Sequence, residues 1–220
     1  MDPIDADLRV AACRSIAEGA TGYTSSHDLE HARRVVGLAR HIARAEGADE
    51  ALVACAAWLH DIERAREDAG GPDHAEAGAA TARRLLPGRA GFSGGDVEAI
   101  ADAVRCHRFR AGPAPSTPEA RALHDGDKLD ALGAVGLGRA YMMAGEHGQR
   151  LHTRPPEGAA PRHVGEIDHT EYSPVEEWTV KLRHLPGRMT TGVGRRLAMN
   201  RAVFMEAFFK QLEDEVRGER

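Results

Sequence analysis

The stretch HDLEHARRVVGLARHIARAEG, residues 27–47, indicates which kind of fold the chain adopts. The positions that we expect to be buried recur at intervals of three and four residues, which is the spacing of one face of an α-helix. These positions are His31, Val35, Leu38 and Ile42. The glycine at 47 is a typical helix end. The stretch therefore predicts an amphipathic helix with a histidine on its buried face.

The same spacing recurs along the rest of the chain, while β-branched residues are sparse. Residues typical of helix N-caps precede most of the periodic segments. The further helices that we expect begin at Asp49, Asp73, Thr117, Ser173 and Thr191. One more helix, marked by Val97, Ile100, Val104 and His107, follows the turn-rich SGGD at 93–96. The helix from Thr117 runs through Asp127, and its continuation to Tyr141 is left open. The sequence predicts an all-α protein.

We expect one domain over residues 1–220, since no linker separates parts of the chain. Its core spans about 24–144 and its C-terminal helices 173–217. Residues 145–172 lack periodicity and are rich in Gly, Pro and His, which predicts a long loop that covers the site as a lid.

Composition narrows the classes of function. The 220 residues carry a formal net charge of -5 and no block of Lys or Arg, which argues against an extended nucleic-acid surface or an anionic membrane as partner. No apolar run is long enough for a membrane span. Three cysteines without C-x-x-C spacing favour neither a disulfide framework nor a zinc knuckle. We expect a cytoplasmic protein.

Histidine and aspartate side chains form the candidate metal site. His60-Asp61 follows the apolar run LVACAAWL, which buries both side chains, and a buried carboxylate is costly unless it is paired or binds a metal. His31 lies on a buried face upstream, and Asp127 lies on an apolar-rich helix downstream. Two imidazoles and two carboxylates suit Mn²⁺, Fe²⁺, Co²⁺, Ni²⁺, Zn²⁺ or Mg²⁺.

The order His31, His60-Asp61, Asp127 resembles the H…HD…D signature of the HD-domain metal-dependent phosphohydrolases. Within that superfamily the chain is similar to the small bacterial YedJ/YpgQ-like group. The similar segments are HDIER (60–64), AIADAVRCHRF (99–109), LHDGDKLDALGAVGLGRAY (123–141) and MTTGVGRRLAMNRAVFMEAF (189–208). One residue that departs from the group is Gly126, where alanine is common.

The resemblance implies an all-helical fold and a divalent metal on His31, His60, Asp61 and Asp127. It also implies hydrolysis of a phosphate ester or anhydride in a small substrate, with nucleotides as the favoured class. Water activated by the metal would attack the phosphorus. Four protein ligands leave about two positions of an octahedral ion open, so we favour Mn²⁺ or Mg²⁺ over tetrahedral Zn²⁺.

His74 and His107 correspond in the resemblance to extra histidines that bind a second metal or phosphate. We favour one ion, with both histidines facing the substrate. Further expected substrate contacts are His27, Arg34, Arg108 and Lys128. Asp61, Glu63 and Lys128 are the candidates for catalysis, with Asp130 as the alternative to Glu63 for polarising the attacking water.

Two rival functions remain open. One is a non-catalytic nucleotide-binding or signalling module, which the presence of all four ligands disfavours. The other is an oxidative enzyme with two irons held by the enlarged ligand set that includes His74 and His107. The apolar stripe of the last helix suits core packing or an oligomer surface, which leaves a homodimer open.

Overall fold

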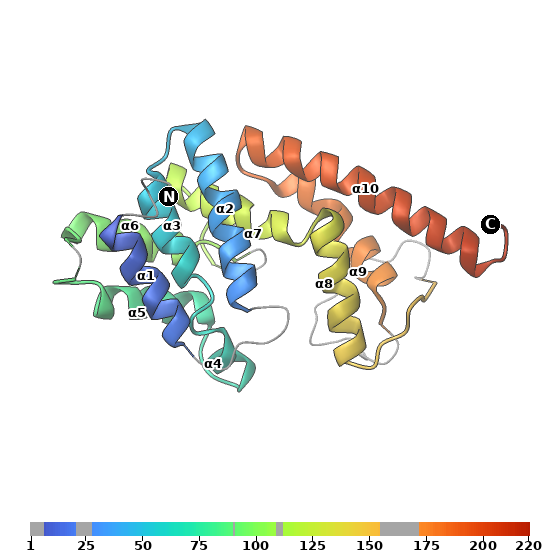
Figure 1. Ribbon diagram of the computed structural model, residues 1–220, viewed down its shortest axis with the longest axis horizontal. Coiled ribbons are helices and arrows are strands. Elements are labelled where there is room, and N and C mark those ends of the chain that lie inside the picture. The colour runs from blue at the N-terminus through green and yellow to red at the C-terminus, as the bar shows by residue number, and fades with distance from the viewer. Residues whose placement is uncertain (1–6, 21–27, 90, 109–111, 155–171) are drawn as a thin grey trace. The chain divides into compact units, whose positions relative to one another are not determined.

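The computed structural model describes residues 7–20, 28–89, 91–108, 112–154 and 172–220. Helices and their connections make up all of this part of the chain, without a strand, which confirms the prediction of an all-α protein (Figure 1). The chain forms two compact units, Met1–Lys128 and Leu129–Arg220. The prediction of a single domain stays a prediction. Among the described residues, no helix has the length and apolar character that a membrane crossing requires.

The first unit is built around a short apolar helix. Its helices are α1 (Leu8–Gly19), α2 (Leu29–Glu46), α3 (Glu50–Leu59), α4 (Arg64–Asp68), α5 (His74–Leu85), α6 (Gly94–Arg105) and most of α7 (Pro118–Asp130). Helix α3 packs against α1, α2 and α6, and α5 packs against α6. Every residue of α3 from Val53 to Leu59 is buried, so this helix forms the centre of the apolar core.

Side-chain caps fix where the helices begin. Asp28, Asp49 and Asp73 accept hydrogen bonds from backbone N–H groups in the first turns of α2, α3 and α5. Ser93 and Asp96 form a reciprocal capping box at the start of α6. The predicted starts at Asp49 and Asp73 are therefore confirmed, whereas α6 begins at Gly94, inside the SGGD segment that we expected to precede it as a turn. These caps matter for the site because they set the register of the helices that carry its histidines.

The second unit contains the C-terminal helices. These are α8 (Gly133–Glu146), α9 (Pro174–Val180), the 3₁₀-helix η2 (Leu182–Arg188) and α10 (Gly192–Val216). Helix α10 packs against α8 and η2. Ser173 and Thr191 cap α9 and α10, as expected. Of the predicted loop, residues 155–171 lie outside the described part of the chain, and residues 147–154 are not helical.

The helix from Thr117 does not continue to Tyr141. Helix α7 ends at Asp130, and α8 starts at Gly133, whose φ of 74° breaks the helical path. Helices α1 and α4 were not expected from the sequence. Helix α4 spans only five residues, which is too short to show a helical period.

Gly126 allows α7 to approach α2 closely. A Cβ atom at Gly126 would lie 2.8 Å from the Cβ of Ala39 and 2.9 Å from its Cα. No side chain fits at that separation, so the contact requires glycine. Because Asp127 is the next residue, the same contact sets how near Asp127 comes to α2.

We predict that Gly126→Ala destabilises the protein by about 1–3 kcal/mol, the usual effect of overpacking a well-packed contact. Gly37→Ala is the matched control, because Gly37 lies in α2 with nothing within 4 Å of an added Cβ. That control should stabilise the protein by about 0.5–1 kcal/mol through helix propensity. Urea unfolding measures both changes. Equal effects of the two substitutions would show that the α7–α2 contact tolerates a side chain.

Candidate metal centre

Two histidines and an aspartate from three helical segments form the first group. His31 lies on α2, His60 directly follows α3, and Asp127 lies on α7. The Nε2 atoms of His31 and His60 are 3.3 Å apart. Oδ1 of Asp127 lies 3.5 Å from Nε2 of His31 and 3.9 Å from Nε2 of His60. Both imidazoles are about 1% exposed. These three side chains converge closely enough to hold one metal ion.

A second group lies next to the first. His74 is the first residue of α5, and His107 follows the end of α6. Their Nε2 atoms are 3.1 Å apart, and Oδ1 of Asp61 lies 3.3 Å from that of His74 and 3.7 Å from that of His107. Asp61, His74 and His107 likewise converge closely enough for one ion.

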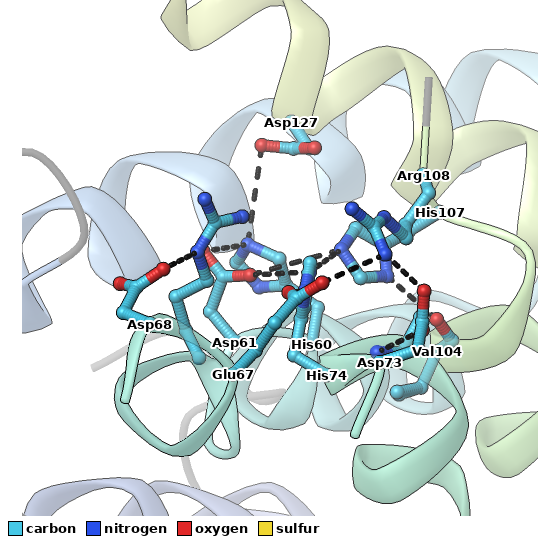
Figure 2. Close-up of polar contacts among 12 residues, drawn as sticks. His60, Asp61, Glu67, Asp68, Asp73, His74, Val104, His107, Arg108 and Asp127 are labelled. Atoms are coloured by element: carbon cyan, nitrogen blue, oxygen red, sulfur yellow. Dashed lines mark hydrogen bonds and ion pairs between the residues drawn. The ribbon is translucent and has the colours of Figure 1, made fainter. Parts of the chain in front are cut away.

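Asp61 connects the two groups. Its Oδ2 atom lies 3.3 Å from Nε2 of His60 and 3.7 Å from Nε2 of His31, while its Oδ1 atom faces His74 and His107. Figure 2 shows Asp61 among His60, His74 and His107, with Asp127 above His60 in this view. One carboxylate thus presents one oxygen to each histidine pair.

Hydrogen bonds at Nδ1 determine which ring nitrogen faces the group. Nδ1 of His60 is 2.8 Å from the carbonyl oxygen of Ala57, and Nδ1 of His107 is 2.6 Å from that of Val104. Nδ1 of His74 contacts the carboxylate of Glu67. Because these oxygens only accept, each Nδ1 donates, and the neutral imidazole then carries a lone pair on Nε2. The Nε2 lone pairs of His74 and His107 therefore face one another and Asp61, and that of His60 faces His31 and Asp61.

Such an arrangement needs a positive charge between the rings. Two unprotonated Nε2 atoms cannot hydrogen-bond to each other, and buried polar atoms without partners are costly. A divalent cation satisfies both lone pairs and the adjacent carboxylate oxygens at once. Imidazole nitrogen and carboxylate oxygen are the donor set of divalent transition-metal sites. The donor chemistry of both groups thus fits a cation.

The charges around the first group favour a cation. Burial opposes a charged His60, but Asp61 and then Asp127 outweigh it and raise the pKa of His60 to about 9. Burial also opposes ionisation of Asp127, yet Lys128 and then His31 hold its pKa well below the usual value. In the second group, burial lowers the pKa of His107 to about 4, and the charge of His60 adds to the effect. His107 is therefore a neutral donor at pH 7.

Two residues that we predicted as substrate contacts, Lys128 and Arg108, instead bind groups of the protein itself. Lys128 is 8% exposed, and its Nζ lies 2.7 Å from Oδ2 of Asp127 and 2.5 Å from the carbonyl oxygen of His107. Arg108 contacts the carboxylates of Glu67 and Asp73. These contacts place the charged side chains of Lys128 and Arg108 next to residues that lie in or beside the two metal groups.

The other predicted site residues are Glu63, Asp130, Arg34 and His27. Glu63 accepts a hydrogen bond of 2.7 Å from the hydroxyl of Thr81. Asp130 belongs to the second unit, where its carboxylate pairs with Arg139 at 2.8 Å. Arg34 is half-buried on α2, one turn after His31. His27 lies outside the described residues.

Glu67 is a site residue that sequence reasoning missed. Burial opposes its ionisation, but His74 and then Arg108 lower its pKa, so it is a carboxylate at neutral pH. It lies seven residues before His74, across a turn that no periodic pattern marks. The available signal was an acidic residue between the His-Asp pair and the next helix N-cap.

Comparisons with known proteins agree with this geometry. The family described as HD domain matches residues 28–132, which include all six residues of the two groups. The protein YpgQ of Bacillus subtilis is 32% identical over 201 residues, covering 90% of this chain and 88% of YpgQ. This chain belongs to the HD-domain superfamily.

Solved HD-domain structures extend the comparison. The structure of Bacillus subtilis YpgQ in complex with ADP has a TM-score of 0.70 at 27% identity in the structural alignment, with 95% of this chain and 98% of that chain covered. A predicted HD superfamily hydrolase from an uncultured Thermotogales bacterium has a TM-score of 0.64 at 27% identity, with coverage of 94% and 90%. The fold is that of an HD-superfamily hydrolase.

Protons and metal compete at His60 in this HD domain. Because the pKa of His60 in the metal-free protein is about 9, the imidazole is protonated at pH 7 and must lose that proton when a cation binds. We predict that the apparent affinity of the first group for Mn²⁺ rises about tenfold between pH 7 and pH 8. Calorimetric titration at the two pH values measures it. An affinity that does not change with pH would contradict a protonated His60.

Proposed function

We propose that this HD domain is a divalent-metal-dependent phosphohydrolase that acts on a small phosphorylated substrate, with nucleotides as the substrate class. One observation carries the proposal: two buried pairs of imidazole Nε2 atoms face each other on either side of the Asp61 carboxylate. The family supports it, because one relative of similar structure, from an uncultured Thermotogales bacterium, is described as a predicted HD superfamily hydrolase.

The first cation would be held by His31, His60, Asp61 and Asp127. When bound, a divalent cation lowers the pKa of water and polarises a phosphoryl oxygen. Four ligands leave about two positions of an octahedral ion open, which suits Mn²⁺ or Mg²⁺. Lys128 holds Asp127 in place through its 2.7 Å ion pair and balances part of its charge.

The second group would hold a second cation, in place of the phosphate that we favoured from the sequence. A phosphate beside Nε2 of His74 would lie next to the carboxylate of Asp61, which is 3.3 Å from that atom, and the two anions would repel each other. The neutral His107 offers a lone pair, which accepts a cation and cannot donate to phosphate. Asp61, which faces both histidine pairs, would help to hold both cations, and together they would supply the charge stabilisation typical of two-metal phosphoryl transfer.

Substrate contacts come from residues around these groups. Glu63, held by Thr81, is our candidate for orienting the attacking water. Arg34 lies one turn after His31 and is our candidate for binding phosphate. The nucleotide class is supported by the relative YpgQ, whose structure was solved in complex with ADP.

The same bridged pair of groups would also fit two irons, so an oxidative reaction is the second candidate. The observation that favours it is the single carboxylate between two histidine pairs. The two functions differ in what they consume. A panel of nucleoside mono-, di- and triphosphates and other phosphate esters, each with Mg²⁺, Mn²⁺, Co²⁺ or Fe²⁺, distinguishes them: phosphate or pyrophosphate release without oxygen supports hydrolysis, and oxygen uptake contradicts it.

We predict that His31→Ala abolishes phosphate release and binding of the first cation, because it removes one of the two facing imidazoles. His41→Ala is the matched control, since His41 is exposed on the same helix. It should leave metal content and activity at wild-type values. Elemental analysis and phosphate release measure both variants. Full activity of the His31 variant would remove the first group from the mechanism.

A further prediction separates the two groups. His74→Ala should halve the metal content of the saturated protein and retain the first ion, because His74 contacts only the Oδ1 side of Asp61. Asp61→Ala should weaken both ions, since it faces both pairs. Calorimetry with Mn²⁺ gives the stoichiometry. An unchanged ion count in the His74 variant, together with a raised KM, would restore the phosphate-binding role.

A further inference from the structure

Glu67 lies in a network outside the two metal groups. It belongs to the short helix α4, between the His60-Asp61 pair and the start of α5. Its Oε2 atom contacts Nδ1 of His74, and its Oε1 atom accepts from Nη1 of Arg108 at 3.1 Å. Figure 2 shows Glu67 between His74 and Arg108. The side chains of Glu67 and Arg108 are 23% and 26% exposed, whereas that of His74 is 2% exposed.

The Nδ1–H group of His74 needs an acceptor from another part of the chain, whereas His60 and His107 find one in their own helices. His60 and His107 each donate Nδ1–H to the carbonyl three residues earlier, that of Ala57 and of Val104. His74 is the first residue of α5, so no helical turn precedes it to supply that carbonyl. A side chain from another element must take this place, and Glu67 does.

The contact determines what His74 presents to the centre. A carboxylate accepts and cannot donate, so Nδ1 carries the hydrogen and Nε2 has the free lone pair. That Nε2 atom faces Oδ1 of Asp61 and Nε2 of His107. Without an acceptor at Nδ1, the ring is free to rotate or to change tautomer, and the lone pair no longer points reliably at the second group.

We propose that Glu67 is a positioning residue for the second cation, because it fixes the ring orientation and the tautomer of His74. Arg108 in turn holds Glu67 in place. The inference rests on the proposed second cation at Asp61, His74 and His107. Arg108 also contacts Asp73, the cap of α5, and so connects the carboxylate of Glu67 to the start of the helix that carries His74. Arg108 acts here through Glu67 rather than on phosphate.

The experiment is a Mn²⁺ titration of the full chain by calorimetry, which reports each ion separately. Wild type should bind two ions. Glu67→Ala should raise the Kd of the second ion about 10–100-fold and leave that of the first within about twofold, in the range known for residues behind metal ligands. Glu67→Gln keeps an acceptor oxygen at Nδ1 and should restore most of the affinity. The matched control is Glu98→Ala, which removes a surface carboxylate paired with Arg83.

The outcomes separate this inference from the proposed function. Wild-type affinities for both ions in Glu67→Ala would overturn the positioning role alone, as would equal weakening of both ions at wild-type helical content. A wild-type protein that binds only one ion would overturn the second cation and the inference with it. Arg108→Met tests the network with Glu67 intact, even where Glu67→Ala does not fold. It should raise only the second Kd, and no change would overturn the network.

Discussion

Imidazole nitrogens that face each other about 3 Å apart with lone pairs on both must share a proton or a cation, and the first unit is organised around this requirement. His74 and His107 form such a pair, because both Nδ1 atoms donate to oxygens, and Nε2 of His31 faces Nε2 of His60 at 3.3 Å in the second pair of rings. The surrounding helices exclude water, so solvent cannot satisfy the rings. Binding of a cation thus offsets the free-energy cost of burying these histidines and Asp61.

The scaffold achieves this geometry with local devices. Aspartate caps fix the starts of α2, α3 and α5, which sets the positions of three of the four histidines. Backbone carbonyls hold His60 and His107, so these rings depend on their own helices only. Gly126 brings α7 against α2 and Asp127 toward His31. His74 differs, since its orientation depends on a side chain of another helix.

Much of this arrangement could be predicted from sequence. Helical spacing placed His31 on a buried face, and an apolar run before His60 showed that the pair would be buried. Helix starts followed from caps such as Asp49 and Asp73. The break after Asp130 could not be seen, because the apolar pattern continues through it, although Leu132 is extended and Gly133 has a positive φ. Contacts between helices could not be predicted either, because tertiary packing decides which charged groups meet. Examples are Asp61, which faces both histidine pairs, and Lys128 and Arg108, which contact carboxylates.

Diffraction from crystals soaked with Mn²⁺, recorded near the manganese absorption edge, tests the central claim most directly. The account predicts two anomalous peaks per chain, one between the Nε2 atoms of His31 and His60 and one between those of His74 and His107, with an oxygen of Asp61 bound to each. It is contradicted if neither position holds an ion at saturating Mn²⁺, or if the imidazoles turn away from one another to hydrogen-bond with protein groups.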